Sequence, residues 1–299
     1  MTGGSKSLRG SLVALVTPMK SDGAVDWAAL DGLVDWHLES GTHGIVPVGT
    51  TGESATLTHD EHKQVIKAVI RRVDGRVPIV AGAGANATAE AIELTESAKG
   101  DGADYCLSVT PYYNKPTQEG LYRHYCAIAE AVDLPMVLYN VPPRTACDMK
   151  AQTVARLAEV DSIVGIKEAC GDADRVAEIK ALVADDFVLL SGEDAQTLTM
   201  VGHGAVGAIS VTANVLPAMM SAFCEAFLAG DREKAAEIDA RLQPIHDILF
   251  VETSPIPSKW ALNAMGRIDG GIRLPLVELT APAQVEVRKR LEALTGAAL

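Results

Sequence analysis

The feature that most constrains this chain is a regular alternation of short apolar runs with longer stretches of helical periodicity. The apolar runs lie at residues 12–16, 44–48, 78–83, 105–109, 136–139, 163–169, 187–191 and 206–211. Helical patterns follow them at about 26–40, 58–73, 88–100, 117–131, 150–159, 172–184, 194–201 and 213–229. Eight strand-then-helix units in series are typical of a parallel barrel with helices outside, and a doubly wound open sheet is the alternative.

The pattern changes after Gly230, where no further strand signal occurs and helical patterns occupy 231–247, 254–265 and 281–295. We therefore predict an α/β fold, a (β/α)8 TIM barrel with a C-terminal helical extension. The expected boundaries are 1–230 for the (β/α)8 barrel and 231–299 for the C-terminal α-helical region. We expect this region to be an appendage of the barrel rather than a separate functional domain.

Composition argues against several classes of protein. A net charge of −13 disfavours nucleic acid as a partner, because nucleic-acid binding requires a basic surface. Residues 200–224 lack Asp, Glu, Lys and Arg, but His203, Asn214 and Pro217 interrupt them, which favours a buried strand and helix over a membrane span. The apolar run at 12–16 ends too early for a signal peptide. The five cysteines are scattered and odd in number, so we expect reduced thiols in a cytoplasmic protein.

One lysine stands inside the apolar run at 163–169. Because side chains alternate along a strand, Gly165, Lys167 and Ala169 are expected to share a face, where two small neighbours leave room for the amine. Lysine is rarely buried, and burial disfavours its charged form. A neutral amine forms Schiff bases with ketones, which makes Lys167 a candidate nucleophile. The alternative is a lysine at a strand end whose amine reaches water.

Other reactive side chains follow the ends of the predicted strands, where parallel barrels place their active sites. The two glycines of 49–54 allow a tight turn whose N–H groups can bind an anion, and its threonine hydroxyls can relay protons or hold a carboxylate. Tyr112 and Tyr113 indicate a site, an aromatic contact between subunits, or both. Tyr139 shares its face with Val137, so its phenol can enter the barrel and shuttle protons.

The ends of the fifth and seventh predicted strands carry three more candidates. Arg144 presents a guanidinium fork suited to a carboxylate, although surface arginines are commonly only solvated. Gly192 allows a ligand to approach the backbone closely. We expect Glu193 and Asp194 to cap the following helix rather than to bind a metal or perform acid–base chemistry.

Two further patterns are similar to motifs that bind a dinucleotide or a zinc ion. Residues 82–87 follow a strand and have Asp104 downstream, as in dinucleotide-binding turns, but they belong to the third of eight units. His59 and His62 are three residues apart, which is not the spacing of zinc-protease helices, and no third ligand follows at a useful interval. We therefore predict no metal site and no nucleotide cofactor.

Three motifs together resemble the pyruvate-dependent class I aldolase (N-acetylneuraminate lyase) family. They are Gly-Thr-Thr-Gly-Glu at 49–53, Tyr-Asn-Val-Pro-Pro-Arg-Thr at 139–145 and Gly-Ile-Lys-Glu-Ala at 165–169. The resemblance covers essentially the whole chain, including 255–260, and is closest to members that condense pyruvate with L-aspartate 4-semialdehyde in diaminopimelate and lysine biosynthesis. It implies a TIM barrel that assembles as a homotetramer, a dimer of dimers.

The resemblance also implies roles for individual residues. Lys167 would form an imine with pyruvate, so that no metal or organic cofactor is needed. Thr50, Tyr139 and Tyr113 would form a proton relay, with Tyr113 entering the site of the neighbouring subunit. Thr51 would join Thr50 in holding the pyruvate carboxylate.

The same resemblance implies how the second substrate is chosen. Arg144 would bind the carboxylate of the semialdehyde, and sugar-cleaving relatives typically lack an arginine in this loop. Backbone groups of Gly192 and Ile209 would complete the pocket. The alternatives are a pyruvate aldolase for a 2-keto-3-deoxy acid and a non-catalytic small-molecule sensor.

A second set of residues resembles the site at which L-lysine inhibits plant and many Gram-negative members. These residues are Ser54, Ala55, His59, His62, Asn86, Glu90 and Tyr112. The resemblance implies that Glu90 pairs with an amine of the inhibitor, while His59 and Asn86 make polar contacts. One departure is Ser254, where members of the family often carry asparagine.

Overall fold

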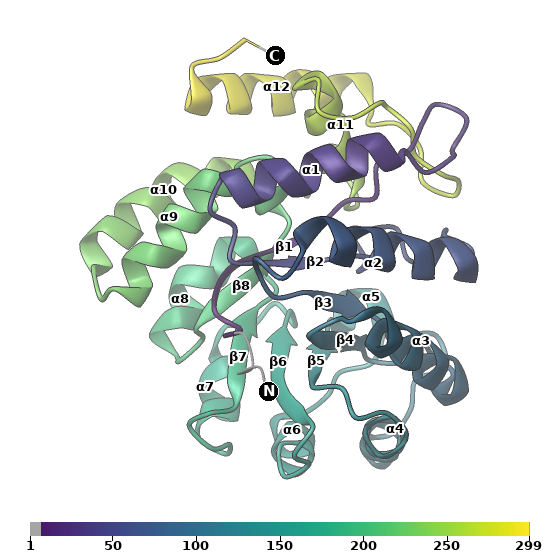
Figure 1. Cartoon of the computed structure of the whole chain (residues 1–299). Helices are drawn as coiled ribbons and strands as arrows, with labels where there is room; N and C mark the ends of the chain where they lie inside the picture. Colours follow the sequence, from purple (N-terminus) through teal and green to yellow (C-terminus); the bar gives the residue numbers. More distant parts are fainter. Residues whose placement is uncertain (1–6, 299) are drawn as a thin grey trace.

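The computed structural model describes residues 7–298, whose centre is an eight-stranded parallel sheet surrounded by helices (Figure 1). The strands are β1 Gly10–Ala14, β2 Gly44–Val46, β3 Val80–Gly82, β4 Tyr105–Val109, β5 Met136–Asn140, β6 Ile163–Glu168, β7 Val188–Ser191 and β8 Gly207–Ser210. Their order in the sheet is β2-β1-β8-β7-β6-β5-β4-β3. A parallel bridge between Ile45 and Ile79 joins β2 to the segment before β3 and closes the sheet. The predicted TIM barrel is confirmed, and the open-sheet alternative is wrong.

Helices follow the strands along the described chain. Those of the barrel are α1 Trp27–Glu39, α2 His59–Val73, α3 Thr88–Asp101, α4 Gln118–Ala131, α5 Pro142–Thr145, α6 Ala151–Leu157, α7 Asp174–Lys180, α8 Thr197–Gly202 and α9 Pro217–Leu228. Those of the C-terminal region are α10 Arg232–Ile248, α11 Ile256–Ala264 and α12 Ala281–Thr295. In Figure 1, α10 lies beside α9, and α12 lies at the top of the view, above α1 and next to α11. The outermost residues of the two expected parts, 1–6 and 299, lie outside the described residues.

Some element boundaries differ from the sequence prediction. The first strand begins at Gly10, two residues earlier than expected. The helices expected at 194–201 and 213–229 each begin with a 3₁₀ turn, at Asp194–Gln196 and Thr212–Asn214. The single turn of α5 was not predicted, because four residues are too few to show a helical period.

The strands separate two apolar layers, as alternation along a strand requires. Val137, Tyr139 and Ala169 belong to the cluster inside the barrel. Leu138 and Ile166 belong to the larger cluster that packs between the strands and the helices. The predicted inward direction of Tyr139 is therefore confirmed.

Helix α2 begins at a capping box, which the sequence itself predicts because Glu61 follows Thr58 after two residues. Thr58 Oγ1 accepts a hydrogen bond from the Glu61 N–H at 3.2 Å, and the Glu61 carboxylate accepts one from the Thr58 N–H at 2.9 Å. These two bonds satisfy backbone donors that the helix itself leaves free. They fix the first turn, which carries His59 and His62.

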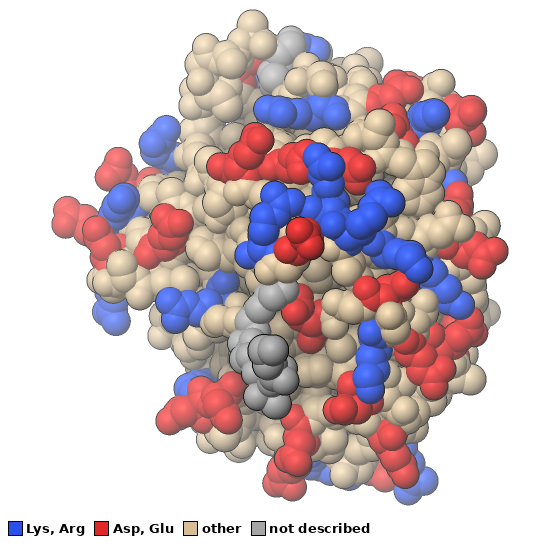
Figure 2. Space-filling model, viewed as in Figure 1, with Lys and Arg blue, Asp and Glu red and all other residues tan. Residues whose placement is uncertain are grey.

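Basic and acidic side chains lie side by side over much of the surface in view in Figure 2. Where α1 and α2 meet, Arg71 pairs with Asp31 at 3.9 Å, and Arg72 pairs with Asp35. The positive charges of Arg71 and Arg72 are therefore neutralised by neighbouring carboxylates. Among residues 7–298, no helix has the length and apolar character needed to cross a lipid bilayer.

The closed barrel predicts a strong difference between two glycines. A Cβ added at Gly82 would lie 2.1 Å from the Val48 carbonyl oxygen, whereas one added at Gly100 in α3 meets nothing within 4 Å. We expect Gly82→Ala to destabilise the protein by about 1–3 kcal/mol, because the clash is with backbone. Gly100→Ala should stabilise it by up to about 1 kcal/mol through helix propensity. Urea unfolding of both variants measures these changes. Equal stabilities of the two variants would contradict the closure of the sheet between β2 and β3.

Candidate active site

The amine of Lys167 lies inside the barrel on β6. Lys167 pairs with Tyr139 across the β5–β6 ladder, and its Nζ lies 4.3 Å from the centre of the Tyr139 ring. Both side chains are buried, with 5% and 6% of their surface exposed. The lysine therefore does not reach out to bulk water, which was the alternative to a buried nucleophile.

Gly192, just after β7, leaves the space that this lysine occupies. A Cβ at Gly192 would lie 2.8 Å from Lys167 Cε and 2.7 Å from Ala169 Cβ. The Gly192 N–H donates to the Glu168 carbonyl at 2.7 Å, so the two strand ends are tied together. A side chain at this position would displace the amine.

The loop after β2 is a compact series of turns. The Gly52 N–H donates to Gly49 and the Glu53 N–H donates to Thr50, each at 3.1 Å. Thr17 Oγ1 donates to the Gly52 carbonyl at 2.7 Å and fastens the loop to the segment after β1. Thr51 is buried, and Glu53 has a positive φ of 56°, which is unusual for a residue with a side chain.

A cavity of about 560 Å³ opens beside this loop. Eight of the predicted site residues line it: Thr50, Ser54, Ala55, His59, His62, Glu90, Tyr112 and Arg144. Thr253 and Ser254 of the C-terminal region complete part of its wall. Arg144 donates to Thr253 Oγ1 at 3.5 Å, and the buried Ser254 hydroxyl has no hydrogen-bond partner in the described residues.

Six of the seven residues expected to bind lysine line this cavity, and three of them come from α2 and α3. His59 Nε2 lies 3.1 Å from Glu90 Oε1. His62 Nε2 lies 2.7 Å from the Gly82 carbonyl oxygen, so its ring is held by the barrel backbone, and burial lowers its pKa. Asn86 does not line the cavity, but its amide donates to the Tyr112 carbonyl at 3.2 Å.

Residues 7–294 match the model of the dihydrodipicolinate synthetase family. The chain belongs to this family. It is 58% identical to 4-hydroxy-tetrahydrodipicolinate synthase of Alcanivorax borkumensis over 95% of this chain and 97% of that protein.

Solved structures agree with this assignment to the dihydrodipicolinate synthetase family. The chloride-inhibited dihydrodipicolinate synthase of Acinetobacter baumannii, complexed with pyruvate, is 52% identical, with a TM-score of 0.95, covering 96% of this chain and 99% of that one. The enzyme of Cyanidioschyzon merolae with lysine bound is 41% identical, with a TM-score of 0.92, covering 95% and 98%.

The predicted residues of this dihydrodipicolinate synthetase family member fall into three groups. Lys167, Tyr139 and Gly192 meet inside the barrel, and Ile209 belongs to the same inner cluster as Tyr139. The second group is the cavity lining described above. The third group belongs to neither: Thr51 is buried in the loop after β2, and Asn86 bonds to the Tyr112 carbonyl. Tyr113 has 89% of its surface exposed and a φ of +73°.

Glu193 stands at the N-cap position of the following helix, but neither its side chain nor that of Asp194 makes a capping bond, so the prediction of a cap is wrong. Asp194 Oδ2 accepts the N–H groups of Val211 and Thr212, both at 2.8 Å, and so holds the turn after β8. Glu193 is half-buried within electrostatic reach of Lys167 and Arg144, and burial raises the pKa of its carboxyl. The partners of both residues are distant in sequence, so local patterns gave no signal for them.

Sequence reasoning also missed a polar cluster behind Lys167. Asn140 and Glu168 follow Tyr139 and Lys167 in adjacent strands and therefore face outward. The Asn140 amide donates to both Glu168 carboxylate oxygens, at 3.0 and 3.2 Å, and to Asp148 at 3.0 Å. The sequence did contain a signal for this cluster. Alternation along the strands puts Asn140 and Glu168 on the outer face of neighbouring strands.

The ionisation of Glu168 gives this cluster a measurable signature. Burial raises the pKa of Glu168 to about 7. Burial alone would also raise the pKa of Asp148, but hydrogen bonds from Arg175, Lys150 and Asn140 lower it to about 2. Asp148 therefore does not titrate in the pH range in which Glu168 does.

We expect the free energy of unfolding to depend on pH through Glu168. A carboxyl whose pKa is higher in the folded state binds its proton more tightly there, so stability falls as pH rises from about 4.5 to about 7 and is constant above. Between pH 5 and 7 the wild type should lose about 2–3 kcal/mol relative to Glu168→Gln, which cannot ionise. Urea unfolding at the two pH values measures this, and parallel pH profiles would contradict it.

Proposed function

We propose that the chain is an enzyme that condenses pyruvate with L-aspartate 4-semialdehyde, as a 4-hydroxy-tetrahydrodipicolinate synthase of lysine biosynthesis. The observation that carries this proposal is the buried amine of Lys167 beside the Tyr139 ring. Relatives that are 55–58% identical bear that enzyme's name. A 52% identical relative was solved with pyruvate, which supports the keto acid as the first substrate.

The proposed reaction uses the lysine as a temporary covalent carrier. The Lys167 amine adds to the pyruvate ketone and water leaves, which gives a protonated imine. This imine withdraws electrons from the adjacent methyl group, which loses a proton and becomes an enamine. The enamine carbon attacks the aldehyde of the second substrate. The amino group of that substrate then displaces Lys167 at the imine carbon, so the ring closes and the lysine is freed.

Neighbouring side chains supply proton transfer and orientation in this scheme. The Tyr139 phenol, whose ring lies beside the amine, carries protons, and Thr50 and Tyr113 continue the relay. The N–H groups and hydroxyls of Thr50 and Thr51 hold the pyruvate carboxylate. The scheme requires neither a metal nor an organic cofactor.

Arg144 is proposed to select the second substrate. Its guanidinium lines the cavity, where a carboxylate of the semialdehyde can accept two parallel hydrogen bonds. The neighbouring Ser254 hydroxyl has no partner among the described residues and is available to a bound polar group. Gly192 and Ile209 complete the pocket from the backbone.

We further propose a cytoplasmic homotetramer, a dimer of dimers, in which Tyr113 enters the site of a neighbouring subunit. The exposure of the Tyr113 ring supports this role, because an aromatic side chain held on the surface at a positive φ suits contact with a partner. Neither nucleic acid nor a membrane is expected as a partner.

L-lysine is proposed to inhibit the enzyme from the part of the cavity that residues of α2 and α3 line. A relative that is 41% identical was solved with lysine bound. Glu90 supplies a carboxylate for an amine of the inhibitor, and its present partner, His59, lies beside it. Ser54, Ala55, His62, Asn86 and Tyr112 form the rest of the proposed site.

Borohydride trapping tests the covalent step. Pyruvate and borohydride should together attach a stable label to the peptide containing 163–169, as found by mass mapping. Lys167→Arg should abolish both the label and turnover. Arg144→Ala should retain the label but lose turnover with the semialdehyde, because the imine forms before the second substrate binds. A label on Lys259, which is also buried and pairs with Glu53 of the cavity wall, would contradict the assignment.

Lysine inhibition has its own test. We expect Glu90→Gln to raise the half-inhibitory lysine concentration about tenfold, equivalent to about 1.4 kcal/mol, because the ammonium loses its ionic partner. Glu93→Gln is the matched control, since Glu93 lies on the same helix but is half-exposed and pairs with Lys63 at 2.6 Å. Initial rates measured over a range of lysine concentrations decide this. Equal shifts in the two variants would contradict the site.

A further inference from the structure

A second buried lysine lies in the C-terminal region. Lys259 on α11 is 4% exposed, and its Nζ pairs with the carboxylate of Glu53, whose side chain is fully buried. The two residues are 206 positions apart in the chain. Removing two charges from water costs several kcal/mol per ion, so such a pair is a poor source of net stability. A role in fixing geometry is the better account of its presence.

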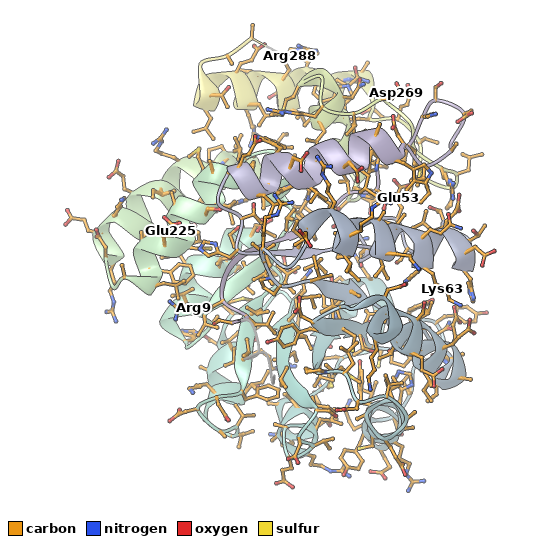
Figure 3. The ribbon with its side chains drawn as sticks, viewed as in Figure 1. Arg9, Glu53, Lys63, Glu225, Asp269 and Arg288 are labelled. Atoms are coloured by element: carbon orange, nitrogen blue, oxygen red, sulfur yellow. The ribbon has the colours of Figure 1, made fainter. Side chains whose placement is uncertain are left out.

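Glu53 lies at the centre of the loop that carries the proposed carboxylate-binding residues. It follows Thr50 and Thr51 directly after Gly52, and it precedes Ser54 and Ala55 of the proposed lysine site. Figure 3 shows Glu53 on the same side of the molecule as Asp269, where the C-terminal segment approaches the barrel. Because the φ of Glu53 is +56°, its backbone conformation is unfavourable without outside support.

Arg273 provides a second connection from the C-terminal region to the same loop. Its backbone N–H donates to Glu53 Oε2 at 3.4 Å, and its guanidinium donates to the Thr56 carbonyl at 2.9 Å. The same guanidinium binds both carboxylate oxygens of Glu61, at 2.6 and 2.7 Å, and thus holds the first turn of α2. The middle and the end of the loop are therefore fastened to one C-terminal segment.

We infer that Glu53 is a positioning residue, through which Lys259 and Arg273 of the C-terminal region hold the Thr50–Thr51 turn in place for the substrate carboxylate. This inference rests on the proposed function, because it assigns the purpose of the contact to pyruvate binding. The Glu53 N–H donates to the Thr50 carbonyl at 3.1 Å, so a shift of Glu53 is transmitted directly to the turn. Small displacements of positioning groups have large effects on binding and turnover.

A double-mutant cycle separates positioning from simple stabilisation. Glu53→Gln and Lys259→Met each leave one buried group without its ionic partner, so both should lower the urea midpoint of unfolding. The double variant removes both charges and should regain most of that stability. Its KM for pyruvate should nevertheless stay raised by about tenfold, as in Glu53→Gln, because the fixed contact is gone. kcat should change much less than KM.

The matched control is Lys180→Met, which removes an exposed lysine–carboxylate pair with Asp185 in the segment between β6 and β7. This variant should keep the wild-type KM. If the double variant regains both stability and KM, or if Lys180→Met raises KM equally, the inference is overturned. A wild-type enzyme that forms no borohydride adduct with pyruvate would overturn the proposed function and this inference with it. Normal trapping with unchanged KM in all variants would overturn the inference alone.

Discussion

Closure of the sheet between β2 and β3 is the constraint on which the rest of the site depends. The cavity is lined by residues that follow β2, β3, β4 and β5 in turn. In an open sheet β2 and β3 would be opposite edges, and the Thr50 loop would lie far from Arg144. The bridge between Ile45 and Ile79 makes the two edges neighbours. It therefore brings a loop rich in hydrogen-bond donors and an arginine to the same opening.

The alternation of strand faces then divides the neighbourhood of Lys167 into two environments. Inside the barrel, the amine lies against the Tyr139 ring and the space left by Gly192. Outside it, Asn140 and Glu168 form a hydrogen-bonded pair in the same two strands. The outer pair joins the strand ends one residue beyond the inner pair, so the reacting groups are braced without a polar contact that would tie up the amine.

The sequence predicted those parts of the molecule that depend on short periods. Eight strands, the inward direction of Tyr139 and the Thr58 capping box all follow from patterns within a few residues. We expected Asp194 to cap the helix that follows it, but its partners, Val211 and Thr212, follow a different strand. The pair of Glu53 and Lys259 could not be predicted for the same reason, because a contact across 206 positions leaves no local pattern in the sequence. Tertiary packing decides such contacts, and single-sequence patterns do not encode it.

The C-terminal region was expected to be an appendage of the barrel, and Lys259 and Arg273 also connect it to the irregular loop after β2. The loop after β2 contains a residue at positive φ, and turns of this kind are held only when surrounding structure over-determines them. An apolar contact would fill the same space but would leave the direction of the loop loosely defined. A carboxylate that meets both an ammonium group and a backbone N–H accepts few orientations. The buried charge at Glu53 thus provides the directional restraint that such a loop requires.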